Sequence, residues 1–195
     1  MKRVILMLGI PFLMGACNEA KSKEEPLNEG KEIAVAMDSP VSVERGKYLV
    51  NTIGCTDCHT PKRMTENGPE PNPELFLSGH PSTEKLPPLD PSEVTGYVAF
   101  SMGLTASVGP WGTSFAANLT PDDTGIGNWT EEQFLTSIKE GKYKGSMNSR
   151  TLLPPMPWQQ YRMLTDNDLK SIFKYLETLK PVENVVPGPI PPTGN

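Results

Sequence analysis

The chain has 195 residues, 36% of them hydrophobic, and a formal net charge of −5, which favours one domain with additional tails over two full domains. Its 21 prolines are about 11% of the chain against a usual ~5%, and 17 glycines bring Pro and Gly together to roughly 19%. This composition excludes a collagen, a coiled coil and a wholly disordered chain, and it favours short helices joined by long, stiff loops. The acidic balance, without any run of basic residues, argues against nucleic acid as a partner. Three cysteines are too few for a disulfide-rich scaffold.

The chain begins with a predicted export signal. Lys2 and Arg3 precede an apolar run of about eleven residues, after which Gly15 and Ala16 lead to Cys17. The run is shorter than the ~20 apolar residues that a bilayer span requires. The small residues directly before Cys17 resemble the lipobox of bacterial lipoproteins, which implies cleavage before this cysteine and a lipid attached to it. The alternative is an ordinary cleaved signal followed by an incidental cysteine.

The next segment, residues 17–42, is expected to be a flexible tether that carries the lipid. It is rich in Lys, Glu, Ser and Pro and shows no apolar periodicity, so it cannot bury enough surface to offset the entropy of ordering. The predicted organisation is therefore a signal peptide over 1–16, the tether, a folded domain over 43–182 and a Pro-rich tail over 183–195 that favours polyproline II.

The segment 55–59 reads C-x-x-C-H, the attachment pattern of haem c. The thiols of Cys55 and Cys58 add across the two vinyl groups of a haem, and His59 then serves as the proximal iron ligand. A thioredoxin-like site would follow a strand in a βαβ unit, and a zinc site would need a second Cys/His pair where only His80 remains. A bare disulfide is chemically allowed in an exported protein. Because cytochrome c maturation occurs outside the cytoplasm, the export signal favours one covalent haem.

Three helices are marked by capping residues and apolar spacing. The first spans 44–53, and the second spans 131–140 after a capping box that begins at Thr130. The last opens at Thr165 and ends at Pro181. No alternating run is long enough to predict a sheet, so the fold is expected to be mainly α with long Pro/Gly-rich loops.

The insert over 61–129, about 70 residues between the haem motif and the second helix, is longer than a structureless loop should be. A short helix near 92–101 is the one element expected there. Trp111 or Trp129 would either donate an indole N–H to a haem propionate or pack on the haem edge or in the core. The acidic pair at 122–123 lacks the alternating oxygen ligands of a calcium loop, so a turn is expected.

Met156 is the predicted sixth iron ligand. It lies between Pro155 and Pro157 directly before the last helix, and prolines stiffen such a loop because they fix φ and remove backbone donors. A stiff loop suits a weak thioether ligand, although a methionine that fills a core gap is the alternative. Met163 is expected to anchor the core. His80 is the alternative sixth ligand, and it would give the haem a lower reduction potential than a methionine would. A place in a turn or a contact with a haem propionate is the simpler role for it.

Several short segments of the sequence resemble segments of a known protein family. They are Gly54 to Pro61, Leu77 to Pro81, Asn118 to Pro121, Thr124 to Gly127 and Met156 to Trp158. Together they resemble cytochrome c, and in particular the cytochrome subunits or domains of bacterial alcohol and sugar dehydrogenases. The resemblance covers roughly residues 43–182. It implies a cytochrome c-like fold in which few helices wrap around one covalent haem, with the axial methionine in a Met-Pro loop. The two terminal helices cross closely in that family, and Gly46 is the candidate for the crossing.

A haem with both axial positions filled by protein has no open site for substrate, and no paired carboxylates or activated nucleophile are recognisable in the sequence. The chain is therefore expected to be an electron-transfer protein rather than an enzyme, exported to the periplasmic or cell-envelope side and lipid-anchored to a bacterial membrane. The resemblance implies a dehydrogenase or respiratory donor and a cytochrome or oxidase acceptor. The alternative is a haem-based sensor in which Met156 dissociates to admit a diatomic ligand. A haem peroxidase would need a distal acid–base pair that is not recognisable here.

Overall fold

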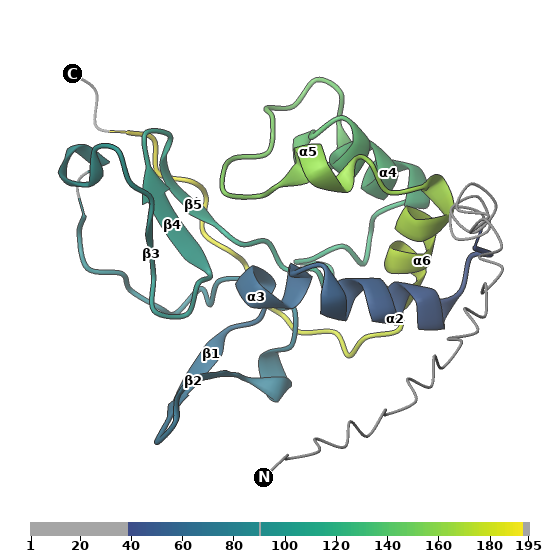
Figure 1. Cartoon of the computed structure of the whole chain (residues 1–195), viewed down its shortest axis with the longest axis horizontal. Helices are drawn as coiled ribbons and strands as arrows, with labels where there is room; N and C mark the ends of the chain where they lie inside the picture. Colours follow the sequence, from purple (N-terminus) through teal and green to yellow (C-terminus); the bar gives the residue numbers. More distant parts are fainter. Residues whose placement is uncertain (1–38, 90, 193–195) are drawn as a thin grey trace, which may run out of the picture.

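The computed structural model describes residues 39–89 and 91–192, so the predicted signal peptide, Cys17 and nearly all of the tether lie outside the described residues. These ranges contain the α-helices α2 (Val43–Thr52), α3 (Cys55–His59), α4 (Glu131–Lys139), α5 (Trp158–Tyr161) and α6 (Asp166–Leu176). The strands are β1 (Lys62–Thr65), β2 (Gly68–Pro71), β3 (Ala99–Phe100), β4 (Ala106–Gly109) and β5 (Gly112–Phe115). Short 3₁₀ turns occupy Pro73–Leu75, Pro91–Val94 and Tyr143–Gly145. Figure 1 shows α2, α4, α5 and α6 gathered in one half of the molecule and β3, β4 and β5 in the other, with α3 between them.

The first and last helices cross at very close range (Figure 1). A Cβ atom on Gly46 of α2 would overlap the backbone carbonyl of Ser171 in α6, so only glycine allows this approach. Beside the crossing, Arg45 Nε donates to Asp168 Oδ1 at 2.8 Å, and the amide of Ser42 donates to Ser171 Oγ at 3.2 Å. The predicted role of Gly46 at a close helix crossing is therefore confirmed.

The core is built mainly from the apolar faces of the three longer helices. It consists of Leu49 and Val50 of α2, Phe134 and Ile138 of α4, Leu169, Ile172, Tyr175 and Leu176 of α6, and Leu77 and Ile126 of the insert. Of the insert residues, Leu77 is fully buried and Ile126 is 1% exposed. The insert thus supplies part of the core rather than looping away from it.

The predicted helices are confirmed with small shifts at their ends. The first begins and ends one residue earlier than expected, and the capping box between Thr130 and Gln133 is present in full. The hydroxyl of Thr165 caps α6 as predicted, but the helix ends at Leu176 instead of reaching Pro181. The chain tightens there into i→i−3 bonds, such as the one from the amide of Leu179 to the carbonyl of Leu176.

The expectation that the fold has no sheet is wrong. β1 pairs with β2, and β3, β4 and β5 form a three-stranded antiparallel sheet in that order. In two hairpins a two-residue turn is followed by a glycine with positive φ, Gly68 at 105° and Gly112 at 90°. β4 is buried along its whole length and β5 along most of its length, so neither strand shows the polar alternation that marks a half-exposed strand.

The helix expected near 92–101 is also wrong. A single 3₁₀ turn over Pro91–Val94 occupies the start of that range, and β3 occupies its end. Gly96, at φ 82°, lies between the two and directs the chain into the sheet.

The described part of the Pro-rich tail lies along the domain. Ile190 forms an antiparallel bridge with Thr113 of β5, with backbone bonds of 2.8 and 2.9 Å. The buried side chain of Asn184 donates to the carbonyl oxygens of Ser78 and His80 at 2.7 and 2.9 Å. These bonds hold residues 183–192 against the insert.

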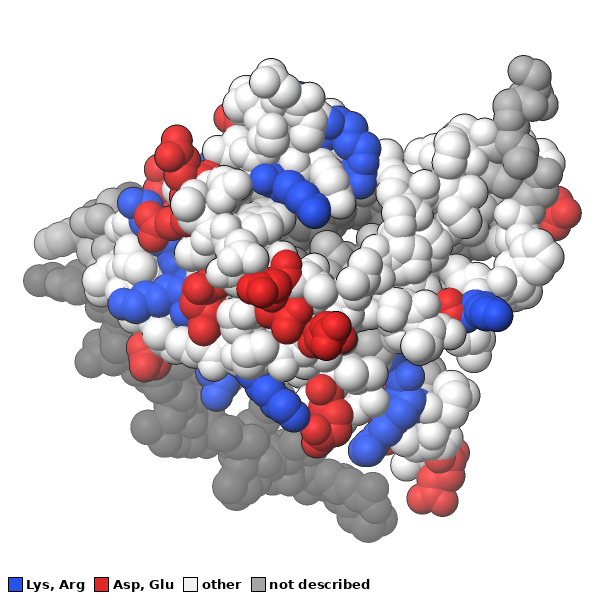
Figure 2. Space-filling model, turned by 180° about the vertical axis from the view of Figure 1, so that it is seen from behind, with Lys and Arg blue, Asp and Glu red and all other residues white. Residues whose placement is uncertain are grey.

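Charged residues are distributed unevenly. Residues 94–121, which include all three strands of the larger sheet, contain no Asp, Glu, Lys or Arg. Figure 2 shows most of the charged side chains over the helical part, with the sheet side largely uncharged on the face in view. Within the described ranges, no helix combines the length and the apolar character that crossing a bilayer requires.

Candidate functional site

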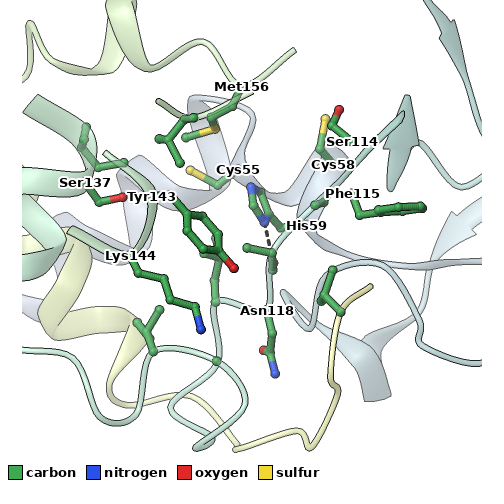
Figure 3. A pocket seen from close by; sticks show the side chains of 18 of the residues that line it. Cys55, Cys58, His59, Ser114, Phe115, Asn118, Ser137, Tyr143, Lys144 and Met156 are labelled. Carbon is green, nitrogen blue, oxygen red and sulfur yellow. Dashed lines mark hydrogen bonds between the residues drawn. The ribbon is translucent and has the colours of Figure 1, made fainter. Parts of the chain in front are cut away.

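The haem motif forms its own short helix. Gly54, at φ 91°, adopts the left-handed conformation that turns the chain from α2 into α3. Within α3, Cys55 and Cys58 are one helical turn apart, and His59 is the last residue. All three line one cavity of about 570 Å³. Figure 3 shows Cys55 and Cys58 on either side of the His59 ring.

The cavity lies between the helical core and the larger sheet. Its apolar wall is made largely by core residues, namely Val50, Ile126, Phe134, Ile138, Leu169, Ile172 and Leu176. The sheet contributes residues from β4 and β5, and the tail closes another side with Val185, Val186, Pro187 and Pro189. The tail, which the sequence separates from the domain, therefore contributes to the wall of the site.

His59 is oriented by a backbone carbonyl of the insert. Its Nδ1 lies 2.7 Å from the carbonyl oxygen of Ala117, which follows β5 (dashed line in Figure 3). Because a carbonyl only accepts, Nδ1 must carry the proton, which leaves the lone pair of Nε2 free for a metal. Burial lowers the pKa of His59 and so favours the neutral imidazole that ligates metals.

The two cysteines are free thiols in surroundings that suppress ionisation. Burial raises the pKa of Cys55 to about 11, and burial followed by the neighbouring Asp57 raises the pKa of Cys58. Redox-active C-x-x-C pairs have lowered thiol pKa values, so this environment is unlike a thioredoxin site. Within the described residues, no group of three or more His, Cys, Asp or Glu side chains is placed so that it could hold a metal ion.

Met156 lies in the same cavity as the C-x-x-C-H segment (Figure 3). Its side chain is half-buried and packs against the hydrophobic core. Both hypotheses, a methionine that fills a core gap and a methionine that binds iron, are compatible with this position. The other methionines that the structure describes are mostly exposed, namely Met64 at 66%, Met102 at 74%, Met147 at 60% and Met163 at 81%. The expectation that Met163 anchors the core is wrong, because Leu164 takes that position in the turn before α6.

A hydroxyl of the sheet supports the loop that carries Met156. Ser114 Oγ of β5 donates to the carbonyl oxygen of Pro154 at 2.7 Å. Ser114 Oγ also lies 2.9 Å from Ser107 Oγ, and it accepts from the indole N–H of Trp111 at 3.2 Å. Since Ser114 has one proton and gives it to Pro154, Ser107 must donate to Ser114. The insert therefore contacts both the loop of Met156 and the ring of His59.

A second link joins the far end of the Met156 loop to the haem motif. The phenol of Tyr161 in α5 donates to the carbonyl oxygen of Ile53 at 2.6 Å, just before Gly54. Burial, with smaller contributions from the cysteines of α3, raises the pKa of Tyr161 to about 12. Tyr161 also lines the cavity, although nothing in the sequence motif singles it out.

Two cations and an aromatic ring stand at one side of the cavity. Lys144 and Arg150 both line it, and the guanidinium of Arg150 lies 4.1 Å from the centre of the Tyr143 ring. Figure 3 shows Tyr143 and Lys144 side by side, with the lysine amine directed along the cavity. These residues follow α4 in a stretch without a recognised motif, so the sequence gives no reason to select them.

His80 is a buried structural residue. It is 1% exposed, its Nδ1 lies 2.9 Å from Thr105 Oγ1, and its ring lies 4.8 Å from that of Phe115. It is absent from the cavity lining, in contrast to Trp129, which contributes to it. Trp111 binds Ser114 as described above, so neither His80 nor Trp111 takes the propionate role considered for it.

The acidic pair at 122–123 forms a turn, as expected. Asp122 Oδ1 accepts from the amide of Thr124 at 2.9 Å. The hydroxyl of Thr124 donates to the same carboxylate oxygen, and this bond, followed by the one from the amide, lowers the pKa of Asp122.

No family model matches the chain. It is 33% identical over 144 residues to the fructose dehydrogenase cytochrome subunit of Gluconobacter japonicus, a match that covers 73% of this chain and 22% of that protein. It is 29% identical over 134 residues to the gluconate 2-dehydrogenase cytochrome c subunit of Pantoea cypripedii, covering 68% and 22%. It is 27% identical over 142 residues to the cytochrome c subunit of the quinone alcohol dehydrogenase of Gluconobacter oxydans, covering 72% and 22%.

The chain thus spans about a fifth of the length of each of these relatives. Their names agree with the family that the short segments of the sequence resemble, and they suggest a cytochrome c-like fold. The chain is similar to the cytochrome c subunits of bacterial fructose, gluconate and quinone alcohol dehydrogenases.

Proposed function

We propose that this chain is a c-type cytochrome that carries single electrons through one haem, attached to Cys55 and Cys58 and ligated by His59 and Met156. The observation that carries the proposal is that these four side chains line one cavity, although Met156 lies about a hundred residues after the segment that holds the other three. Similarity to dehydrogenase cytochrome subunits supports the same assignment.

The residues present fit such a group. The cavity of about 570 Å³ lies within the ~300–1,000 Å³ typical of cofactor sites, and its wall is mainly apolar. Two thiols one turn apart suit two thioether bonds, and an imidazole and a thioether are a known axial pair. A haem held in this way supplies a reversible one-electron couple whose potential the Met ligand raises.

The chain's own residues position and insulate this site. Ala117 fixes the tautomer and orientation of His59, and Ser114 holds the loop of Met156. We assign Lys144 and Arg150 as the counter-charges of the haem carboxylates, because they are the two basic side chains among the described residues that line the cavity. The apolar wall would keep water from the metal, and a haem iron held by both His59 and Met156 would transfer electrons without binding a substrate.

The proposed partners follow from the relatives. A dehydrogenase subunit, or another respiratory donor, would reduce the site, and a cytochrome or oxidase would accept the electron. Such redox contacts are small, typically below ~1,200 Å² of buried surface. Cleavage after residue 16 and a lipid on Cys17 would hold the domain over 43–182 at the periplasmic or cell-envelope face of a bacterial membrane, with residues 17–42 as the tether.

The ligand assignment is tested with Met156→Ala, compared with Met163→Ala, which alters an 81% exposed methionine. The ferric wild type and Met163→Ala should both show the weak far-red absorption band of a thioether on haem iron, and Met156→Ala should lose it. Wild-type ferrous protein should bind carbon monoxide poorly and Met156→Ala readily. A wild type that lacks the band and binds carbon monoxide as readily as Met156→Ala would contradict the electron-carrier assignment and favour the haem-sensor alternative.

A further inference from the structure

Lys62 turns its side chain back onto the haem motif. It is the first residue of β1, three residues after His59 in the sequence, and its side chain is half-buried. Its Nζ donates to the carbonyl oxygens of Thr60 at 2.6 Å, Asp57 at 2.8 Å and Thr56 at 3.4 Å. Three acceptors require three N–H groups, so the side chain is held as the charged ammonium ion.

These acceptors lie at the carboxyl end of α3, where a helix leaves its last carbonyl groups without partners. Two of these carbonyls, those of Thr56 and Asp57, belong to the five-residue helix, the third belongs to its C-cap Thr60, and carbonyls at a helix end carry partial negative charge. The carbonyl of Thr56 also accepts from the amide of the C-cap residue Thr60 at 3.3 Å, and the carbonyl of His59 accepts from the amide of Gly79 at 2.8 Å. Lys62 completes this end of the helix.

The charge of Lys62 also reaches the side chains of the motif. Desolvation lowers the pKa of Lys62, while Asp57 and Cys58 oppose that shift. The ammonium is therefore electrostatically coupled to Asp57 within the haem motif.

We propose that Lys62 is a positioning residue of the haem motif that locks the end of α3 and, through its positive charge, raises the reduction potential of the site. This inference rests on the proposed function. The ferric state carries one more positive charge than the ferrous state, so a fixed cation nearby destabilises the ferric form. Residues 94–121, which include the larger sheet, contain no Lys or Arg. The contribution of Lys62 to the reduction potential is therefore not accompanied by that of a cation from the sheet.

The test compares the midpoint potentials of the full-length, haem-loaded protein and three variants. Lys62→Met removes the charge and the donors but keeps an unbranched side chain, and Lys62→Arg keeps the charge. Lys85→Met is the matched control, because Lys85 is exposed and forms no contact with the haem motif among the described residues. We expect Lys62→Met to shift the Fe(III)/Fe(II) equilibrium about threefold to tenfold toward the ferric form, or about 30–60 mV at 59 mV per tenfold. Lys62→Arg should restore most of the shift, and Lys85→Met should match the wild type.

Haem content, measured on every variant, separates this inference from the proposed function. If the wild type itself holds no covalent haem, the proposed function fails. If Lys62→Met holds one haem per chain with the wild-type potential, or if Lys62→Arg is as low in potential as Lys62→Met, the role of the charge is refuted. Should Lys62→Met fail to retain haem, Lys62→Gln, which is neutral but keeps two N–H donors, takes its place in the same comparison.

Discussion

The hydroxyl of Ser114 donates to the carbonyl oxygen of Pro154 across a distance of 2.7 Å, although 40 residues separate the two in the chain. Three residues beyond Ser114, the carbonyl of Ala117 holds the ring of His59 at 2.7 Å. One short stretch of the insert thus contacts the segments of both candidate iron ligands. The physical role of the insert is to fix these segments relative to each other.

The first prediction concerns Ser114→Ala. It removes the donor to Pro154 and leaves that carbonyl, as well as Ser107 and Trp111, without this partner. Loss of a buried bond of this kind costs about 1–3 kcal/mol. We expect the far-red thioether band to be displaced by added imidazole at roughly fivefold to a hundredfold lower concentration, because 1.4 kcal/mol is tenfold in a binding constant.

The control for that experiment is Ser82→Ala, since the exposed Ser82 forms a hydrogen bond through its backbone amide and, within the described residues, none through its hydroxyl. In Ser82→Ala, displacement of the far-red band should require the same imidazole concentration as in the wild type. Equal imidazole sensitivity in Ser114→Ala and the wild type would mean that the Met156 loop does not depend on the sheet.

A second prediction concerns the helix crossing. In an exposed helix Gly→Ala would stabilise by about 1 kcal/mol, but in Gly46→Ala the new Cβ overlaps the backbone of Ser171 and forces α2 and α6 apart. We expect a net loss of about 1–3 kcal/mol in the free energy of unfolding, measured by urea titration. Gly188→Ala is the matched control, because nothing lies within 4 Å of its Cβ position. A Gly46→Ala protein as stable as Gly188→Ala would show that the helices do not pack as described.

A third prediction is a pH dependence. The ammonium of Lys139, 2.9 Å from Asp166 Oδ1, lowers the pKa of this carboxyl by hydrogen bonding and by charge. A carboxyl with a lowered folded-state pKa contributes stability above its unfolded value of about 3.9, and loses it as the pH falls through the folded value. Because Asp166 is 66% exposed, the pair contributes only about 0.2–1 kcal/mol.

Asp166→Asn should therefore be slightly less stable than the wild type at pH 7 and equally stable at about pH 2, where both side chains are neutral. Urea titrations at the two pH values measure this difference. Glu66→Gln, at an exposed carboxyl that forms no ion pair with the described residues, should show no difference at either pH. A stability gap for Asp166→Asn that grows as the pH falls would contradict the assigned sign.

A fourth prediction concerns the tail. Asn184 is 9% exposed, its amide binds the carbonyls of Ser78 and His80, and its oxygen accepts from the amide of Ser82. Asn184→Ala leaves these backbone groups unpaired at a cost of about 1–3 kcal/mol and should release the tail. We expect faster digestion of the C-terminus by carboxypeptidase than in the wild type or in Glu183→Ala, followed by mass spectrometry. Unchanged digestion would show that the tail is held by other contacts.

The sequence predicts the elements whose signals are local. Helix caps such as Thr130 and Thr165 act on backbone groups within three residues, so their effect is visible in a short window. The close crossing at Gly46 and the shared cavity of Met156 and the C-x-x-C-H segment were also expected, the first from the family resemblance and the second from the loop and its place before the last helix.

There is a physical reason why the larger sheet could not be predicted from the sequence. Ser107 and Ser114 are buried polar residues that satisfy each other and the Pro154 carbonyl, so the strands that carry them lack an apolar face that alternates with a polar one. The carbonyl of Ala117 is a backbone group, and any residue type would present it. Lys62 resembles any surface lysine until its three carbonyl acceptors are known.

The most direct test of the account is the ratio of covalent haem to polypeptide, measured by pyridine haemochrome absorbance on the exported protein after extraction with acidified acetone. Non-covalent haem is removed by this extraction, whereas thioether-linked haem stays with the chain. We predict one haem per chain in the wild type and none retained when Cys55 and Cys58 are both replaced by Ala. A wild-type chain that retains no haem, or a double variant that retains it fully, would contradict the assignment.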